Sequence, residues 1–214
     1  MRLRKVKNAL DKLKANQKYF IENPQDYKGK WQSVFGNNNP IHIEIGCGKG
    51  QFISTLATLN PNINYLAIEK YDSVLLRCLE KVENLNLENL HLILLDASEL
   101  TNYFADGEIE RIYINFSDPW PKNAHAKRRL TYKNFLDSYY QVLSENGDVF
   151  QKTDNRKLFE FSLESFNTNG WLLSNISLNL HEDTDTFNIM TEFEEKWSKK
   201  GPIYRLEARK KKND

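Results

Sequence analysis

The sequence predicts an α/β protein with an open, mostly parallel β-sheet and helices on both faces. From Pro40 onward, short apolar segments alternate with amphipathic ones, which is the pattern of strand–helix–strand units. Residues 91–97 are nearly continuous in apolar side chains, as expected of a strand buried on both faces. The last two predicted strands have no strong helix between them, so we expect an antiparallel edge strand.

The 214 residues suit one sizeable domain. Residues 1–36 read as a basic, helical N-terminal arm that ends in loops rich in Asn, Gly and Pro, and residues 37–214 as the main domain. Strands are predicted, in order, at residues 41–46, 64–69, 91–97, 111–119, 147–155, 171–180 and 203–210. Helices are predicted at residues 72–85, 132–143 and 156–168, and a further helix should open after the glycines that follow the first strand.

Composition gives little information about partners, but the distribution of charge gives more. The formal net charge is only +1. Basic residues nevertheless gather near both termini, at Arg2, Arg4, Lys5, Lys7, Lys12, Lys14 and Lys18 and at Arg209, Lys210, Lys211 and Lys212. Such clusters create a local positive field on a nearly neutral protein.

Cysteine usage and hydropathy predict a cytoplasmic protein. The two cysteines, Cys47 and Cys78, form neither a disulfide framework nor a zinc-ligand spacing, which fits a reducing compartment. The N-terminus is too polar for a signal peptide, and no apolar run approaches membrane-spanning length. We therefore expect no membrane partner and no required metal.

A carboxylate follows or closes each of the first five predicted strands. These acids are Glu44, Glu69, Asp96, Asp118 and Asp154. In open α/β sheets, ligands bind beyond the carboxyl ends of the strands, so the acids should meet at one edge. Because like charges repel there, such a cluster favours a ligand that supplies positive charge or hydroxyl donors.

The first of these loops, after residues 41–46, is typical of nucleoside-binding folds. Its glycines, Gly46, Gly48 and Gly50, let the backbone approach a ligand closely. An acid at the end of the second strand, here Glu69, suits the two hydroxyls of a ribose. A dinucleotide pyrophosphate prefers helix N-terminal amides to nearby acids, whereas S-adenosylmethionine has no phosphate and carries a sulfonium cation. Electrostatics therefore favours S-adenosylmethionine over NAD.

The stretch NFSDPWPKNAHAKRRL, residues 115–130, joins an acid, a rigid turn and a basic run. Pro119 and Pro121 restrict the backbone around Asp118 and Trp120. Trp120 suits either stacking on a nucleic-acid base or packing in the core. The basic run suits contact with phosphates. The alternative is structural: Asp118 caps the turn, and the cationic loop is merely solvated.

Five motifs together resemble the bacterial tRNA (guanine-N7)-methyltransferase family. They are EIGCGKGQF (44–52), IEK (68–70), NFSDPWPKNAHAKRRL (115–130), KTDN (152–155) and TEFEEKW (191–197). The resemblance runs from about Pro40 to the C-terminus. It implies a Rossmann-like class I S-adenosylmethionine-dependent methyltransferase fold. It also implies methyl transfer to N7 of a guanine in the tRNA variable loop, with S-adenosylhomocysteine as the product.

The resemblance also implies roles for individual residues, with Asp118 as the catalytic residue. The positions implied for the cofactor are Glu44, Gly46, Gly48, Gly50, Glu69, Asp96 and Asp118. Those implied for substrate binding are Lys122, Asp154, Thr191, Glu192, Phe193 and Glu194. Those implied for RNA contact are Ala124, His125, Ala126, Lys127, Arg128 and Arg129. Phe193 stands where the family has Tyr, so any role of that hydroxyl is absent here.

Three alternatives remain open from the sequence. The first is a methyltransferase that acts on another nucleic-acid base or an exocyclic amine; Asp118-Pro119-Trp120 loosely resembles its D/N-P-P-aromatic signature, but Trp120 replaces the second proline. The second is an NAD-dependent oxidoreductase, which the acid cluster disfavours. The third is a non-catalytic RNA-binding protein. The N-terminal arm is a candidate for RNA contact or for ordering on binding, and the sequence allows a monomer or a homodimer.

Overall fold

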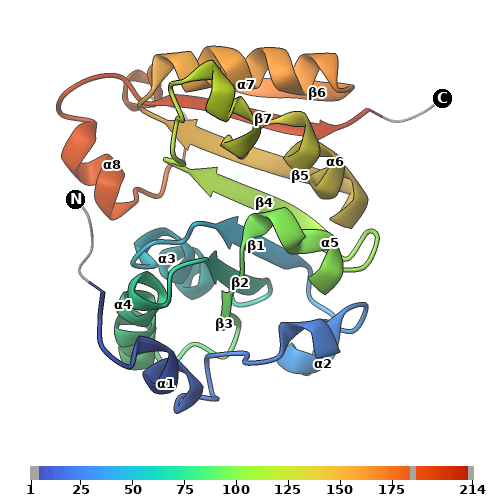
Figure 1. Ribbon diagram of the computed structural model, residues 1–214, viewed down its shortest axis with the longest axis vertical. Helices are drawn as coiled ribbons and strands as arrows, with labels where there is room; N and C mark the ends of the chain where they lie inside the picture. The colour runs from blue at the N-terminus through green and yellow to red at the C-terminus, as the bar shows by residue number, and fades with distance from the viewer. Residues whose placement is uncertain (1–4, 184–186, 212–214) are drawn as a thin grey trace.

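A computed structural model describes residues 5–183 and 187–211 of the protein (Figure 1). Of the basic clusters, Arg2, Arg4 and Lys212 lie outside these residues. The strands are β1 (Ile41–Ile45), β2 (Asn64–Glu69), β3 (Leu90–Leu94), β4 (Ile109–Asn115), β5 (Leu143–Thr153), β6 (Trp171–Ser177) and β7 (Tyr204–Lys210). They form one sheet in the order β3-β2-β1-β4-β5-β7-β6. β1 to β5 pair in parallel and β7 runs antiparallel to both β5 and β6, which confirms the predicted fold class.

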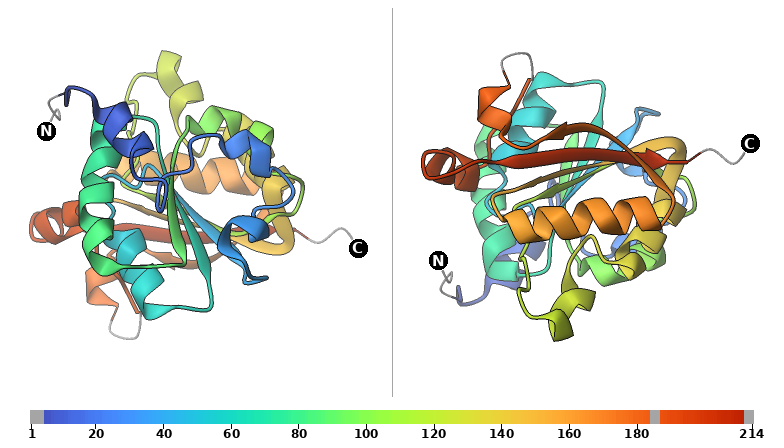
Figure 2. Two further views of the ribbon diagram at one scale, coloured as in Figure 1. Left: turned by 90° about the horizontal axis from the view of Figure 1, so that it is seen from below. Right: turned by 90° about the horizontal axis from the view of Figure 1, so that it is seen from above.

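Helices cover both faces of this sheet (Figures 1 and 2). The α-helices are α1 (Ala9–Lys14), α2 (Gln32–Phe35), α3 (Gln51–Leu59), α4 (Asp72–Val82), α5 (Leu100–Tyr103), α6 (Lys133–Val142), α7 (Arg156–Thr168) and α8 (Glu192–Trp197). The 3-10 helices are η1 (Pro24–Tyr27), η2 (Glu83–Leu85), η3 (Ala97–Glu99), η4 (Asn123–Arg128) and η5 (Leu180–Glu182). α1, α3 and α4 share one apolar cluster with the sheet, whereas α5, α6 and α7 belong to the cluster on the opposite face.

The central strands are buried on both faces, which explains their unbroken apolar runs. Along β1, Ile41, Ile43 and Ile45 belong to the cluster on the α6 and α7 side, while the side chains between them belong to the other face. β2 divides in the same way, with Leu66 and Ile68 on one side. Every residue of β1 and β2 is buried, so a polar side chain in either strand needs a specific partner.

The described part of the N-terminal arm packs onto the domain. α1 lies against α4 and buries Ala9 and Leu13. The backbone around Phe20 pairs with β3 at Leu92. Trp31 is fully buried and its indole Nε1 donates to the carbonyl of Tyr103 at 2.8 Å. Among the described residues, no helix is both long and apolar enough to cross a membrane.

Candidate active site

The five predicted acids lie at or directly after the carboxyl ends of the parallel strands, and these strand ends form one edge of the sheet (Figure 1). Glu44 is the last residue but one of β1, and Glu69 is the last residue of β2. Asp96, Asp118 and Asp154 follow β3, β4 and β5 within three residues. Parallel pairing of β1 with β2 and β4 fixes this arrangement, because it aligns their carboxyl ends.

Glu44 is a buried carboxylate with one oxygen that has no protein partner. Its side chain is 1% exposed, and Asn115 Nδ2 donates to Oε1 at 2.8 Å. No hydrogen-bond donor among the described residues reaches Oε2, although this atom is buried. Burial raises the pKa of Glu44 to about 8, against the opposing effects of Asn115 and the Lys152 ammonium. A buried, unpartnered acceptor at a strand end favours a ligand that brings a donor or a cation.

The next two acids are held by neighbouring backbone amides. Glu69 Oε1 accepts hydrogen bonds from the amides of Lys70 at 2.9 Å and Tyr71 at 3.2 Å, and burial raises its pKa. Asp96 is exposed and caps η3, where it accepts from the Ser98 amide at 2.9 Å. That hydrogen bond lowers the pKa of Asp96. Glu69 therefore presents its second oxygen at the end of β2, where a ribose would lie in this fold.

The glycine loop between β1 and α3 has a backbone that only glycine adopts easily. Gly46, Gly48 and Gly50 have φ values of 75°, 59° and 81°. A Cβ on Gly50 would lie 2.3 Å from Cys78 Sγ, so close packing against α4 also requires glycine there. Apart from the adjacent residues in the chain, no described residue has an atom within 4 Å of the place where a Cβ on Gly46 or Gly48 would stand. The loop therefore offers bare backbone and open space beside Glu44.

Asp118 lies in a turn bounded by two strained residues. Phe116 has a φ of 51° and Trp120 a φ of 41°, which non-glycine residues seldom adopt. The Phe116 amide donates to the carbonyl of Lys152 at 2.8 Å and so continues the β4–β5 pairing into the turn. Asp118 itself is exposed. Strain on both sides of one exposed carboxylate is typical of a side chain held in place for function.

The basic segment predicted to contact RNA folds around Trp120. It forms η4, in which Ala124 and Lys127 are exposed and His125 and Ala126 are half-buried. The indole of Trp120 packs edge-on against His125 at 5.8 Å, and the exposed guanidinium of Arg128 lies 4.8 Å from its ring centre. Trp120 is thus the anchor of η4 rather than a free aromatic ring. Lys122 and Asp154 are exposed, and no side-chain hydrogen bond to either is present among the described residues.

Arg129 differs from the other basic residues, because its guanidinium points at the turn that carries Asp118. Nε donates to the carbonyl of Pro119 at 3.1 Å, and Nη2 donates to the carbonyl of Trp120 at 3.0 Å. The guanidinium also lies 4.5 Å from the ring centre of Phe161 on α7. Arg129 therefore links the Asp118 turn to α7. The sequence-based prediction grouped it with the RNA-contacting residues, since the contact with the carbonyls cannot be read from spacing.

The segment before and within α8 packs on the same edge of the sheet. Thr191 caps α8 by accepting from the Glu194 amide at 3.0 Å, and Glu192 pairs with Lys81 of α4 at 2.7 Å. Phe193 is 40% exposed and its ring lies 4.9 Å from that of Phe116. Of the four predicted substrate-binding positions here, only Phe193 has a largely exposed side chain beside the Asp118 turn.

Glu194 is fully buried and its carboxylate is used inside the protein. Lys152 Nζ donates to Oε2 at 2.6 Å, and Asn188 Nδ2 donates to Oε1 at 2.6 Å. His181 Nε2 lies 3.1 Å from Oε1. The same Lys152 ammonium also donates to Asn188 Oδ1 and to the carbonyl of Ile189. Glu194 thus holds the segment before α8 against β5, and no substrate contact is needed to explain its burial.

Two functional residues were not named from the sequence: Asn115, which holds Glu44, and Lys152, which holds Glu194. Both lie at the end of a strand and are partners in the β4–β5 register. Asn115 offered a signal, because a polar side chain between Ile114 and Phe116 needs a partner where the strand is buried. Lys152 lies between Gln151 and Thr153 and offered none. Both also line a cavity of about 230 Å³ on the α3 face of the sheet, with Phe52, Tyr113, Phe150 and Asn188 among its walls.

This arrangement can bind a cationic, hydroxyl-rich ligand and present an exposed carboxylate beside it. Two buried acids and a bare glycine loop form one part, and the Asp118 turn forms the other. Within residues 5–183 and 187–211, no group of three His, Cys, Asp or Glu side chains is placed to hold a metal ion. The groups that this edge supplies are carboxylates, backbone amides and aromatic rings.

Solved structures share this fold at low sequence identity. A 16S rRNA (adenine(1408)-N(1))-methyltransferase from Catenulisporales acidiphilia, solved with cosubstrate SAM, aligns with a TM-score of 0.62 at 13% identity and covers 87% of this chain and 92% of its own. An antibiotic-related methyltransferase aligns with a TM-score of 0.60 at 17% identity, over 84% of this chain and 91% of its own. Similarity at this level of identity shows the fold alone.

Sequence comparisons find relatives of much higher identity than these solved structures. Residues 38–206 match a family model described as a putative methyltransferase. A tRNA (guanine-N(7)-)-methyltransferase from Streptococcus gordonii is 56% identical over 97% of this chain and 99% of its own length. One from a Geobacillus species is 53% identical over 98% of this chain and 96% of its own. The chain therefore belongs to the tRNA (guanine-N(7)-)-methyltransferase family.

Proposed function

We propose that the protein transfers a methyl group from S-adenosylmethionine to N7 of a guanine in the variable loop of tRNA. The observation that carries this proposal is the pairing of two features at one sheet edge. One is the buried, unpartnered oxygen of Glu44 beside a bare glycine loop. The other is the exposed Asp118 in a strained turn next to a basic segment. The names of the relatives support tRNA as the partner, and with this substrate we propose a cytoplasmic location.

The residues present fit S-adenosylmethionine. Glu44 and the backbone of the glycine loop would hold its charged amino-acid portion, because a buried carboxylate without a donor suits an ammonium group. Glu69 would accept from the ribose hydroxyls, and Asp96 would face the adenine beyond β3. S-adenosylmethionine, when bound, supplies an electrophilic methyl group on a sulfonium centre.

Asp118 fits the electrostatic demand of this reaction. Guanine N7 carries a lone pair in the plane of the base and no hydrogen, so no proton has to be removed before methylation. The ring becomes cationic as the methyl group is acquired, and a nearby carboxylate stabilises that charge. A carboxylate also accepts hydrogen bonds from the guanine N1–H and the N2 amine, which orients the base. We assign this role to Asp118, with Asp154 as the second carboxylate and Phe193 as an apolar wall.

Arg128 of η4 and Arg129, the residue directly after this helix, are expected to have different roles. Arg128→Gln should lower RNA affinity and reduce the slope of log K against log salt by about 0.7–0.9, the value for one phosphate contact. Arg129→Gln should leave that slope unchanged but lower the rate at saturating tRNA by about tenfold or more, because the Asp118 turn loses its link to α7. Fluorescence anisotropy across a salt series and single-turnover kinetics measure the two effects.

Arg129→Lys is the control for charge. It keeps the positive charge but cannot bridge two carbonyl groups in the same way. The methyl-transfer rate of Arg129→Lys should therefore stay low, while its slope of log K against log salt equals that of the wild-type protein. A reduced salt slope in Arg129→Gln would instead place this side chain on the RNA.

The affinity for S-adenosylmethionine is expected to rise with pH up to about 8. The pKa of Glu44 is raised to about 8, so the carboxyl group is protonated at neutral pH in the free protein. A cationic ligand favours the ionised form, so binding below pH 8 releases one proton, and affinity rises by up to about tenfold per pH unit. Calorimetry in buffers of different ionisation enthalpy counts that proton. Glu44→Gln should bind more weakly and release none; equal proton release by both proteins would contradict the assignment.

The decisive test of the reaction uses a tRNA that lacks the reacting atom. Unmodified tRNA, and the same tRNA with 7-deazaguanosine in the variable loop, would be incubated with labelled S-adenosylmethionine and digested to nucleosides. We expect 7-methylguanosine from the first and no methylation of the variable loop in the second. Methylation of the 7-deaza tRNA at that position would show that another atom, such as an exocyclic amine, is the acceptor. Cofactor binding without transfer to any RNA would also overturn the proposal.

A further inference from the structure

The glutamates of α8 contact the domain, whereas the lysines of α8 and of the turn after it are exposed. All three glutamates of α8 are engaged with the domain: Glu192 pairs with Lys81, Glu194 pairs with Lys152, and Glu195 accepts from Gln51 Nε2 at 2.5 Å. Three lysines, by contrast, are exposed and form no ion pair with any other described residue; they are Lys196, Lys199 and Lys200. These three lysines outnumber Glu195, an exposed acid of α8 whose hydrogen-bond donor is the uncharged Gln51, so the surface around them is basic.

A column of aromatic rings fixes this basic surface relative to Asp118. Phe116, two residues before Asp118, contacts Phe193 at 4.9 Å between ring centres. Phe193 stacks on Trp197 at 5.5 Å with an interplanar angle of 24°. Lys200 Nζ lies 4.1 Å from the ring centre of Trp197 and closes the column. The Lys196 and Lys200 ammonium groups are therefore connected through the column to the turn that carries the proposed catalytic residue.

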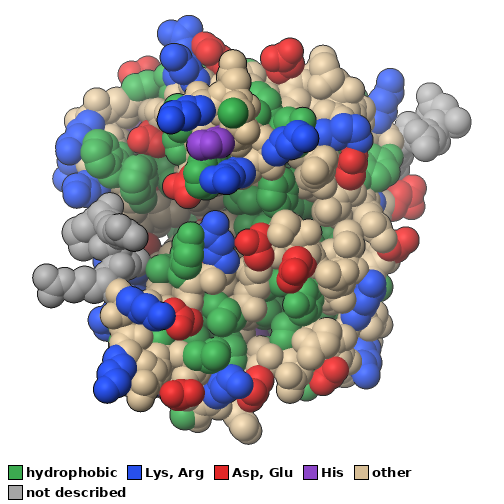
Figure 3. All heavy atoms as spheres, in the orientation of Figure 1, with side chains coloured by type: hydrophobic (Ala, Val, Ile, Leu, Met, Phe, Trp, Pro, Cys, Tyr) green, Lys and Arg blue, Asp and Glu red, His purple; other side chains and the backbone are tan. Residues whose placement is uncertain are grey.

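α8 and η4 lie at the same edge of the sheet but on different faces. α8 is held by Gln51 of α3 and Lys81 of α4, whereas η4 is linked through Arg129 to Phe161 of α7. Figures 1 and 2 show the two segments on either side of the edge where β4 ends. In Figure 3, Lys and Arg side chains border the hydrophobic patch over α8 and also gather over η4. A polyanion that places one base at Asp118 would meet positive charge on both sides.

We propose that Lys196, Lys199 and Lys200 form a second phosphate-binding edge for the RNA substrate, opposite Lys127 and Arg128. The inference rests on the proposed function for the identity of the RNA. Two basic edges on either side of the reacting base would hold the strand from both directions. The aromatic column links Lys196 and Lys200, which both lie over the Trp197 ring, to the turn that carries Asp118.

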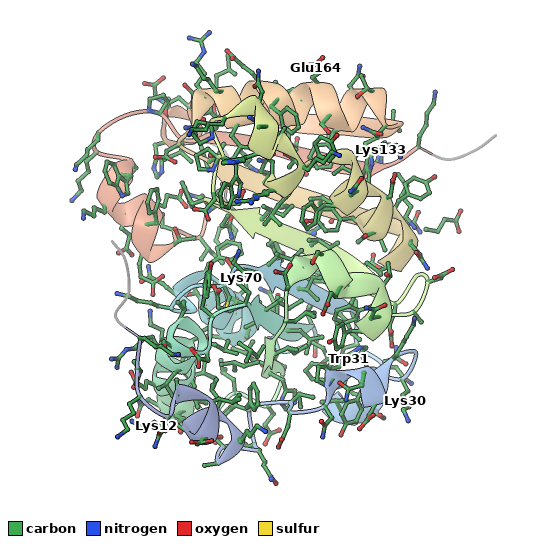
Figure 4. The ribbon with its side chains drawn as sticks, viewed as in Figure 1. Lys12, Lys30, Trp31, Lys70, Lys133 and Glu164 are labelled. Carbon is green, nitrogen blue, oxygen red and sulfur yellow. The ribbon has the colours of Figure 1, made fainter. Side chains whose placement is uncertain are left out.

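A matched pair of double variants tests this surface. Lys199→Gln with Lys200→Gln removes two charges from it, and Lys30→Gln with Lys133→Gln removes two charges from the far side of the molecule (Figure 4). Binding of unmodified tRNA without S-adenosylmethionine would be measured by fluorescence anisotropy from about 50 to 300 mM salt. We expect the first pair to reduce the salt slope by about 0.7–0.9 for each phosphate that a lysine no longer neutralises, and the second pair to leave it unchanged.

Kinetics then separates binding from structure. The first pair should raise KM for tRNA several-fold while kcat stays within about twofold, and Lys199→Arg with Lys200→Arg should restore both the slope and KM. The proposal would be overturned if the first pair left the salt slope unchanged, or if the control pair reduced the slope by the same amount. It would also be overturned if the first pair lowered kcat without changing the slope. The salt slope is measured by binding alone, so its result stands apart from the identity of the methylated nucleoside, which tests the reaction.

Discussion

Asp118→Asn is expected to reduce the single-turnover rate of methyl transfer by about 10²- to 10³-fold, or about 2.7–4 kcal/mol of transition-state stabilisation. The amide keeps the shape of the side chain but lacks the negative charge that stabilises the positive charge developing on the guanine. Asp118 is exposed and has no hydrogen-bond partner among the described residues that would rearrange, so the fold should be unaffected. The rate is measured at saturating tRNA and S-adenosylmethionine.

The same variant separates catalysis from cofactor binding. S-adenosylmethionine affinity, measured by calorimetry, should change far less than the rate, because Glu44, Glu69 and the glycine loop remain intact. Asp26→Asn, an exposed substitution in η1 far from the sheet edge, is the control and should change neither. Equal losses of rate and of cofactor affinity in Asp118→Asn would assign Asp118 to the cofactor alone.

The fold was predictable because its strands are local features of the sequence. Each predicted strand is present, and the apolar runs of β1 and β2 reflect burial on both faces. The site was predictable in part for the same reason, since parallel strands bring their carboxyl ends together without any knowledge of side-chain contacts. Glu44, Glu69 and Asp118 follow from this rule alone.

Contacts between distant segments could not be predicted in this way. Lys152 and Glu194 are separated by 42 residues, and their spacing gives no sign that they pair. Arg129 looks like its basic neighbours in the sequence, yet it donates to carbonyl groups ten and nine residues earlier. In both cases the function of a charged side chain depends on which way the backbone directs it, and that direction is a property of the tertiary structure.

Glu194→Ala is expected to lower the free energy of unfolding by about 3–5 kcal/mol, because it leaves the Lys152 ammonium buried without a carboxylate. Burial already lowers the pKa of Lys152 even with Glu194 in place, so the unpaired ammonium would be still harder to accommodate. The hydrogen bonds from Asn188 and His181 would be lost at the same time. Urea denaturation at pH 7 measures the change.

A double-mutant cycle distinguishes a buried ion pair from two independent packing residues. Lys152→Met alone should also destabilise the protein, since it leaves the Glu194 carboxylate unpaired. Lys152→Met with Glu194→Ala removes both charges and should cost much less than the sum of the single changes. Additive losses would mean that the pair is not coupled. The double variant should nevertheless have a lower affinity for S-adenosylmethionine and a lower kcat. Lys152 also donates to Asn188 and to the carbonyl of Ile189, and these contacts hold the segment that leads to Phe193 beside the Asp118 turn.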